Sequence, residues 1–202
     1  MQKVDLWNTS LFVAQVNDES LNTMLKNEIV SLSESQPSIN KSNIGSWHSE
    51  YGLNKSENKE IQRIHSIVAS QIKAVYLQGV NEEKLDDYVL LCESWANINV
   101  RATFQNIHTH SGWAMSAVYY VKVPEVEDKA QDGTIQFHNF SASQVNPNFD
   151  LLSSLLGNET RRISPKTGML IIFPSHMPHS VLPSFSDDER ITIAFNFRYR
   201  KK

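Results

Sequence analysis

The chain has 202 residues, of which 40% are hydrophobic and 20% are charged, a composition that excludes a disordered chain and suits a single domain spanning 1-202. Its formal net charge of -3 and isoelectric point near 6.2 give no electrostatic reason to expect a nucleic-acid partner. The single cysteine, Cys92, rules out an internal disulfide, and no apolar run reaches membrane-spanning length or forms a signal-peptide core, so we expect a cytoplasmic protein without membrane contact.

Residues 1-87 are predicted to be mainly helical. A first helix is expected after Asn17 and Asp18, which are good N-cap types, because apolar residues then recur at helical spacing: Leu21, Met24, Leu25 and Leu32. A second helix is expected between Ser56 and Gly79, with an apolar stripe at Ile61, Ile64, Val68, Ile72 and Val75. The polar segment between them, 36-58, shows no helical pattern.

From Tyr88 onward the apolar pattern changes to a period of two, which is typical of strands. The strand-like segments read VLLCESWANINVRATF, MSAVYYVKV, GTIQFHNF, GMLIIFPS and RITIAFNFRYR. Helices followed by a run of strands predict an α+β fold in which 88-202 forms a β-sandwich or barrel and 1-87 supports it. The long polar segment Asn139 to Arg162 is interpreted either as a lid over a site or as a surface excursion.

The two faces of the last strand differ in character. One face is apolar and calls for a covering layer of helices: Ile191, Ile193, Phe195, Phe197 and Tyr199. The other face carries Arg190, Thr192, Ala194, Asn196 and Arg198. This second face fits either the lumen of a barrel, where Arg190 would need an anionic partner because an unpaired buried charge is very costly, or an exposed edge strand.

The segment QNIHTHSGW, residues 105-113, places His108 and His110 two positions apart. On a strand this spacing directs both imidazoles to the same side, so they could converge on a metal ion or form a polar face in contact with water. A metal site would need a third ligand. His176 and His179 follow another apolar strand and supply candidates, with Arg190 a further eleven positions along the chain.

These motifs in their order resemble the double-stranded β-helix oxygenases that use Fe(II) and 2-oxoglutarate, in particular the prolyl-hydroxylase-like members. The resemblance is closest to an uncharacterised branch from cyanophages and marine bacteria. It rests on the sequences WAN, QNIHTH, SAVYYVKVP, PKTGMLIIFPS, HSVLP and RITIAFNF, and the N-terminal sequences LWNTSLF and SNIGSWHSEYGL also fit. It implies a jelly-roll, cupin-like barrel with the N-terminal helices packed on one sheet.

The resemblance also implies roles for single residues. His108 and His179 match two metal ligands, and His110 occupies the position of the ligand between them. Arg190 matches the basic residue that pairs with the far carboxylate of 2-oxoglutarate, and Tyr120 and Thr192 match hydroxyl groups that contact the same carboxylate.

One position departs from the general superfamily pattern, which has aspartate or glutamate where this chain has His110. Two histidines and one carboxylate on one octahedral face leave three positions open, and a third imidazole keeps that geometry but removes one negative charge. His110 is therefore either a ligand or a neighbour of the site, in which case water or an acid such as Asp132 would complete it.

The function implied is a dioxygenase that consumes 2-oxoglutarate and O2 and hydroxylates a prolyl or other peptidyl side chain, in the host cytoplasm if the gene is phage-borne. The resemblance leaves a homodimer open. Two alternatives remain: a three-histidine cupin-type dioxygenase that does not use 2-oxoglutarate, and a non-catalytic jelly-roll binding or phage structural module with a vestigial metal site. Arg190 argues against the first, and the missing acidic ligand favours the second.

Overall fold

The computed structural model describes residues 9-126, 132-139 and 160-202. The helices are α1 Glu19–Ser35, α2 Lys59–Tyr76 and α3 Glu82–Leu85, with a short 3-10 helix at Leu53–Lys55. The strands are β1 Phe12–Gln15, β2 Asn43–Ile44, β3 Trp47–His48, β4 Tyr88–Asn99, β5 Phe104–His108, β6 Met115–Lys122, β7 Ile135–His138, β8 Thr160–Ile163, β9 Met169–Pro174, β10 His179–Val181 and β11 Arg190–Lys201.

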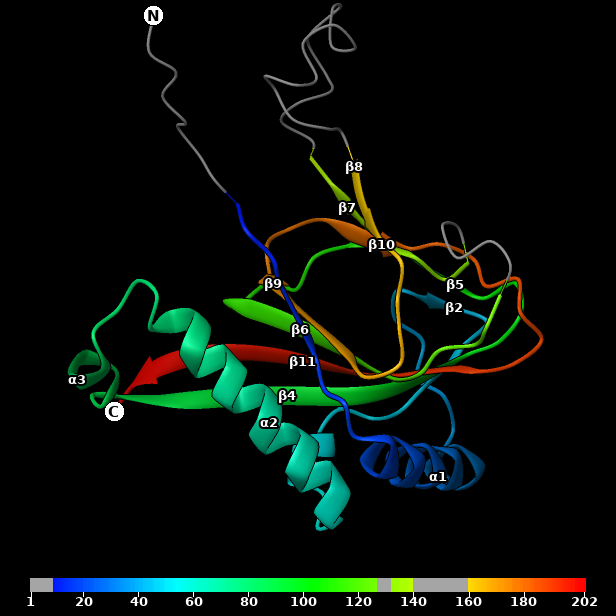
Figure 1. Cartoon of the computed structure of the whole chain (residues 1–202), viewed down its shortest axis with the longest axis horizontal. Coiled ribbons are helices and arrows are strands. Elements are labelled where there is room, and N and C mark those ends of the chain that lie inside the picture. Colours follow the sequence, from blue (N-terminus) through cyan, green and yellow to red (C-terminus); the bar gives the residue numbers. More distant parts are fainter. Residues whose placement is uncertain (1–8, 127–131, 140–159) are drawn as a thin grey trace, which may run out of the picture.

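The strands form two antiparallel sheets that face each other. The larger sheet has the order β1-β9-β6-β11-β4-β3, and the smaller has the order β2-β5-β10-β7-β8. Helices α1 and α2 cover the outer face of the larger sheet (Figure 1). The predicted fold of antiparallel strands with the N-terminal helices packed on one sheet is confirmed, but strand β1 precedes α1, and strands β2 and β3 lie between α1 and α2, which the sequence analysis did not predict.

Both long helices begin where a side chain caps the first turn. The carboxylate of Asp18 accepts a hydrogen bond from the Leu21 amide at 2.9 Å, as its residue type suggested. Helix α2 is capped by Asn58, whose Oδ1 accepts from the amides of Glu60 and Ile61, so the start expected at Ser56 was too early. Most of the two apolar stripes is buried against the sheet as predicted, but Met24 is 40% exposed, and Leu32 and Val75 are only partly buried.

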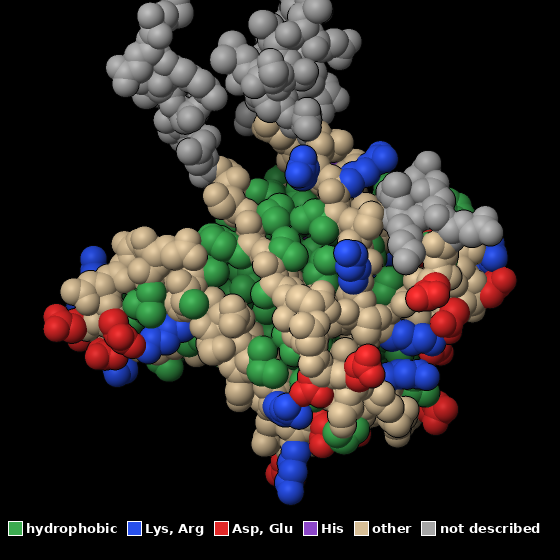
Figure 2. Space-filling view, viewed as in Figure 1, with side chains coloured by type: hydrophobic (Ala, Val, Ile, Leu, Met, Phe, Trp, Pro, Cys, Tyr) green, Lys and Arg blue, Asp and Glu red, His purple; other side chains and the backbone are tan. Residues whose placement is uncertain are grey.

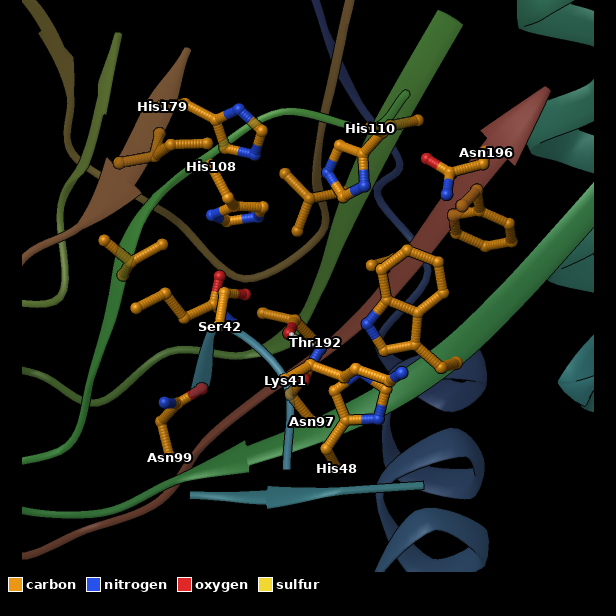
Figure 3. A pocket seen from close by; sticks show the side chains of 18 of the residues that line it. Lys41, Ser42, His48, Asn97, Asn99, His108, His110, His179, Thr192 and Asn196 are labelled. Carbon is orange, nitrogen blue, oxygen red and sulfur yellow. Dashed lines mark hydrogen bonds between the residues drawn. The ribbon is translucent and has the colours of Figure 1, made fainter. Parts of the chain in front are cut away.

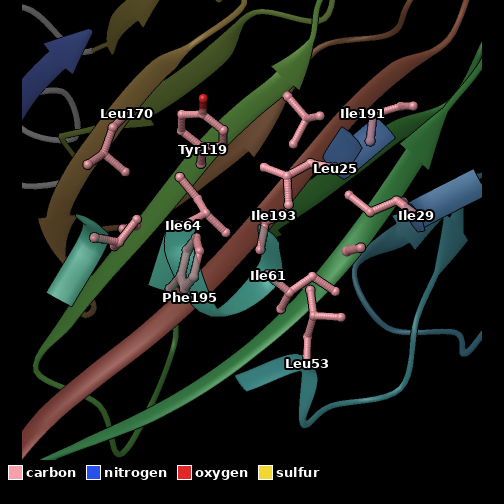
Figure 4. Packing of buried hydrophobic residues seen from close by; sticks show 14 of the residues in the cluster. Leu25, Ile29, Leu53, Ile61, Ile64, Tyr119, Leu170, Ile191, Ile193 and Phe195 are labelled. Atoms are coloured by element: carbon pink, nitrogen blue, oxygen red, sulfur yellow. The ribbon is translucent and has the colours of Figure 1, made fainter. Parts of the chain in front are cut away.

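One core joins these helices to the larger sheet (Figure 4). Leu25 and Ile29 from α1 meet side chains from α2 and from the sheet, all of them fully or nearly fully buried: Ile61, Ile64, Tyr119, Leu170, Ile191, Ile193 and Phe195. The Tyr119 hydroxyl donates to Asn22 Oδ1 at 2.5 Å, so this buried phenol is hydrogen-bonded to α1. The apolar face of β11 therefore has the helical cover that the sequence predicted.

Strand β11 lies between β6 and β4, so the interpretation of its polar face as an exposed edge was wrong. It pairs with β4 over its full length, from Arg190 opposite Asn99 to Lys201 opposite Tyr88. The polar face points into the space between the two sheets, where Arg190 and Thr192 are buried. The strand-like sequence VLLCESWANINVRATF forms parts of two strands, β4 and β5. The turn between them contains Ala102, which has a φ of 64°.

A short segment, Asn43–His48, crosses from one sheet to the other. Its first two residues, β2, pair with Gln105 and Phe104 of β5 in the smaller sheet. Its last two, β3, pair with Ile98 and Asn97 of β4 in the larger sheet. The turn between them contains Gly45, whose φ of 75° favours glycine. We call these six residues the crossing segment. The sequence pattern did not reveal it, because two-residue strands leave no periodicity.

Most of the predicted 139-162 excursion lies outside the described residues, but Thr160–Ile163 is strand β8, which pairs with β7. In the described part of the chain no helix is long and apolar enough to span a membrane. Figure 2 shows acidic side chains gathered around α3 and hydrophobic side chains near the middle of the same face.

Candidate metal and cosubstrate site

The pairing of β5 with β10 brings two of the predicted histidines together. His108 and His179 are direct partners in this antiparallel ladder, although 71 positions separate them in the sequence numbering. His110 follows β5 by two residues, and its backbone amide donates to the Ser175 carbonyl at 2.8 Å, just beyond β9. Three strands of two different sheets thus fix the backbone around the three imidazoles.

The three rings converge on one point (Figure 3). Their centroids are 4.3 Å apart for His108 and His179 and 5.1 Å apart for each pair that includes His110. Each ring offers a nitrogen atom, and these atoms all lie within 4.8 Å of one another. Among the described residues this is the one cluster of histidine, cysteine or acidic side chains with a spacing that could hold a metal ion.

Hydrogen bonds fix the tautomer of two of these histidines. Nδ1 of His108 lies 2.7 Å from the Asn106 carbonyl oxygen, and Nδ1 of His179 lies 2.9 Å from that of Met177. A carbonyl can only accept, so each Nδ1 carries the proton and each Nε2 keeps a free lone pair. This is the usual arrangement around a histidine that coordinates a metal through Nε2.

The electrostatic surroundings keep the cluster uncharged. Burial, followed by the proximity of His108, lowers the pKa of His110 to about 4. Burial is also the main reason why the pKa of His179 falls to about 3, and it lowers the pKa of His108. Since only the neutral imidazole can coordinate a metal, all three rings are in the competent form at neutral pH.

A buried cation lies in the same cavity as the histidines. Arg190 is 3% exposed, and its Nη1 donates a hydrogen bond to the Gly133 carbonyl. Burial lowers the pKa of Arg190, while Tyr120 and Asp132 nearby favour its charged form, and a guanidinium stays protonated in a protein. The phenol of Tyr120 is also buried, and this burial raises its pKa to about 12. Tyr120 and Thr192 are direct partners in the β6–β11 ladder.

The cavity has a volume of about 300 Å³ and is lined by the three histidines together with Arg190, Tyr120 and Thr192. Asn97 lines it as well. Its Nδ2 lies 3.5 Å from the Thr192 hydroxyl, and its buried Oδ1 has no hydrogen-bond partner among the described residues. Because buried polar atoms are almost always hydrogen-bonded, this atom indicates a bound ligand or water.

An aromatic wall that the sequence analysis did not predict lines the same cavity. His48, from the crossing segment, stacks on Trp95 of β4 with ring centroids 5.6 Å apart, and Tyr51 meets Trp95 edge to face at 5.1 Å. Trp95 in turn lies 5.8 Å from His110. The available signal was that Trp95 shares a strand face with Asn97 and Asn99, but nothing in the sequence showed that 41-51 would fold against that face.

Asp132, considered as an acid that might complete the metal site, is not part of the histidine cluster. Its carboxylate accepts a hydrogen bond from the Phe185 amide, and it contributes to the electrostatic environment of Arg190. His176, the other candidate from the same loop, lies outside the cluster too. The structure therefore leaves His110 as the residue at the third corner of the cluster.

The sequence from 93 to 196 matches the protein family described as "Putative 2OG-Fe(II) oxygenase". The match covers more than half of the chain. The chain belongs to this family. It is therefore an oxidoreductase whose cofactors are Fe(II) and 2-oxoglutarate, and the alternative of a non-catalytic module is set aside. No curated protein sequence matches the chain significantly.

Solved structures of similar fold support the predicted jelly roll. A prolyl-4-hydroxylase from Pseudomonas putida is 18% identical with a TM-score of 0.65, and the alignment covers 95% of this chain and 94% of that one. A prolyl hydroxylase from Trichoplax adhaerens, in complex with a hypoxia inducible factor peptide fragment, is 17% identical with a TM-score of 0.65 and coverages of 93% and 82%. HygX from Streptomyces hygroscopicus, with nickel and 2-oxoglutarate bound, is 10% identical with a TM-score of 0.62 and coverages of 94% and 82%.

The donor set of this oxygenase fits its cofactors. Three neutral imidazoles with two free Nε2 lone pairs suit a divalent iron, and a buried guanidinium in the same cavity suits a dicarboxylate. The molecules bound in the structures of the neighbours range from a peptide to hygromycin B, so the fold does not define the ligand.

Proposed function

We propose that this oxygenase hydroxylates an aliphatic carbon of a prolyl or other peptidyl side chain. In this proposal His108, His110 and His179 bind Fe(II). Arg190 pairs with the far carboxylate of 2-oxoglutarate, with Tyr120 and Thr192 as hydrogen-bonding neighbours. Fe(II) with 2-oxoglutarate and O2 supplies the oxidation: the substrate C–H becomes C–OH, and 2-oxoglutarate and O2 yield succinate and CO2.

The observation that carries the assignment is a tri-imidazole cluster and a buried arginine in one cavity. An arginine–carboxylate pair is both strong and orienting, because two N–H groups can meet two oxygens. A cupin-type dioxygenase without 2-oxoglutarate would have no use for Arg190 at this place. The peptidyl substrate is suggested by the peptide bound to the Trichoplax neighbour.

The chain's residues have three tasks in this reaction. The three neutral imidazoles would hold Fe(II), which would supply the oxidising chemistry together with 2-oxoglutarate and O2. Arg190 and Tyr120 fix the cosubstrate at its far end. The cavity is also lined by the apolar residues Val118, Ile135 and Phe173, which exclude water from the reacting groups.

The decisive experiment measures succinate formed from 2-oxoglutarate by the full chain, with Fe(II) and O2, with and without a chelator. Metal-dependent turnover is expected. Arg190→Ala should abolish 2-oxoglutarate binding while metal content stays unchanged. The matched control is Arg198→Ala, because Arg198 lies on the same strand face but is exposed. Equal 2-oxoglutarate affinity in Arg190→Ala and Arg198→Ala would refute the assignment of Arg190.

A further inference from the structure

The pairing of β4 with β11 shows the order in which residues follow one another along the cavity. Arg190 lies opposite Asn99, Thr192 opposite Asn97, and Ala194 opposite Trp95. Each two-residue step along a strand advances about 7 Å. The backbone beside Trp95 is therefore roughly 14 Å from that beside Arg190. Since the Trp95 ring also contacts His110, the histidine cluster lies near the Trp95 level.

This order assigns the two ends of the cavity to different ligands. The proposed 2-oxoglutarate extends from the histidines toward Arg190. A primary substrate must reach the metal from the remaining side, where Trp95, His48 and Tyr51 form the aromatic wall. The exposed fractions of Trp95 and His48 are 6% and 3%, whereas Tyr51 is 41% exposed. The wall is therefore shielded from solvent at Trp95 and His48 and exposed to solvent at Tyr51.

Aromatic faces of this kind bind apolar groups of a ligand. His48 adds a polar contact. Its Nδ1 lies 2.6 Å from the Ser49 carbonyl oxygen, and burial lowers its pKa, so Nδ1 carries the only ring proton and Nε2 is an acceptor. An acceptor on a cavity-lining ring suits a ligand with N–H groups, such as a peptide backbone.

A positive charge lies beside the wall. Lys41 lines the cavity, with its Nζ 5.7 Å from the centre of the Tyr51 ring. No Asp or Glu is among the described residues that line the cavity, and Lys41 has no carboxylate within salt-bridge distance in the described part of the chain. The carboxylate of Glu93 adds to the effect of burial in raising the pKa of Tyr51, but it accepts a hydrogen bond from Asn196 at 3.2 Å and does not line the cavity.

The third histidine also leaves the cavity with less negative charge. At a site with two histidines and a carboxylate, the protein supplies one negative charge next to the metal, whereas His110 supplies none. Once 2-oxoglutarate has paired with Arg190, Lys41 is the remaining Lys or Arg side chain among the described residues that line the cavity. An anionic group on the primary substrate would compensate its positive charge.

We infer that the aromatic wall and Lys41 form the primary-substrate subsite, and that the substrate is an acidic peptide. Its apolar side chain packs against Tyr51 and Trp95, and a neighbouring carboxylate meets Lys41. This inference rests on the proposed function for the reaction at the metal, but it concerns different residues and is tested by binding.

The test uses the full chain loaded with Fe(II) and 2-oxoglutarate under nitrogen, so that no turnover occurs, and isothermal titration calorimetry. The probes are three proline-centred peptides with blocked ends that differ in their flanking residues, which are glutamate, glutamine or lysine. The glutamate peptide should bind best and the lysine peptide worst, and added salt should reduce the difference. Lys41→Gln should reduce the preference for glutamate over glutamine about fivefold, and Lys41→Arg should keep it.

The aromatic half of the subsite has its own variants. Tyr51→Ala should lower the affinity for the glutamate peptide and for the glutamine peptide alike by about tenfold. Tyr51→Phe should bind both peptides nearly as tightly as the unchanged protein does. The affinity for 2-oxoglutarate, measured on each variant, serves as the control for folding and should not change.

Three results would overturn the inference: no preference for the glutamate peptide, a preference that survives in Lys41→Gln, or a loss of 2-oxoglutarate affinity in Lys41→Gln, which would assign Lys41 to the cosubstrate. Failure of all three peptides to bind would also overturn it. Metal-dependent succinate formation in the same preparation would then leave the proposed roles of the histidines and Arg190 intact.

Discussion

Gly133 offers a direct way to move the proposed cosubstrate anchor without removing it. The φ of Gly133 is 54°, and a Cβ atom built on it would overlap Nη1 and Cζ of Arg190. The carbonyl of Gly133 also accepts the hydrogen bond from Nη1. In Gly133→Ala the guanidinium must therefore shift away from its present position, although it remains in the cavity.

Gly133→Ala should affect both the stability of the fold and the binding of 2-oxoglutarate. The left-handed backbone conformation costs an L-residue about 1–2 kcal/mol of folding free energy. Displacing Arg190 removes a charge-assisted hydrogen bond to 2-oxoglutarate that contributes about 1.5–3 kcal/mol. The affinity for 2-oxoglutarate should therefore fall about tenfold to 150-fold, since 1.4 kcal/mol corresponds to a factor of ten.

The assay is calorimetric titration of 2-oxoglutarate into metal-loaded protein. Gly52→Ala is the matched control, because Gly52 has a φ of 110° but no atom within 4 Å of the added Cβ. Both variants should lose similar stability and retain their metal, and only Gly133→Ala should lose 2-oxoglutarate. A dissociation constant for Gly133→Ala within twofold of the Gly52→Ala value would refute the placement of the cosubstrate on Arg190.

Further expectations concern the metal, the phenol and the core. His110→Ala should lose most bound metal on dialysis and His110→Asp should keep it, whereas full retention in His110→Ala would exclude His110 as a ligand. Bound metal should be retained from neutral pH down to about pH 5 and lost as the pH falls through about 4, because protonation of His110 and His179 removes their lone pairs; loss already at pH 6 would contradict the effect of burial. Tyr120→Phe should lower the affinity for 2-oxoglutarate about threefold to tenfold in titrations and leave the metal content unchanged. Leu25→Ala should lower the free energy of unfolding in urea by about 2–5 kcal/mol, and Met24→Ala, at a position 40% exposed, by far less.

The sequence predicted what depends on periodicity and on known motifs. The apolar stripe from Ile61 to Ile72 and the alternation along β11 both indicated which face is buried, and the structure agrees. The spacing of His108 and His110 predicted a shared side of one strand, whereas His110 follows β5 by two residues and still lies beside His108 and His179. The predictions for the helix and for β11 succeed because a helix or a long strand repeats its signal over many residues.

Features made by single residues or short pairings escaped the sequence analysis. Strand β10 has three residues, and β2 and β3 have two each, too few for a period to be visible. The interpretation of β11 as an edge failed because strand order depends on contacts between segments far apart in the chain. The placement of Tyr51 beside Trp95 was hidden for the same reason.

The crossing segment has a consequence for how this site could change. Because Asn43–Ile44 pairs with one sheet and Trp47–His48 with the other, the same six residues link the two sheets and place His48 in the wall of the cavity. Inserting a residue beside Gly45 would thus alter two properties at once, the width of the opening and the position of His48 in the wall. Selectivity for a bulkier substrate is most simply gained here, by exchanging one short, continuous stretch of chain and leaving the histidine cluster untouched.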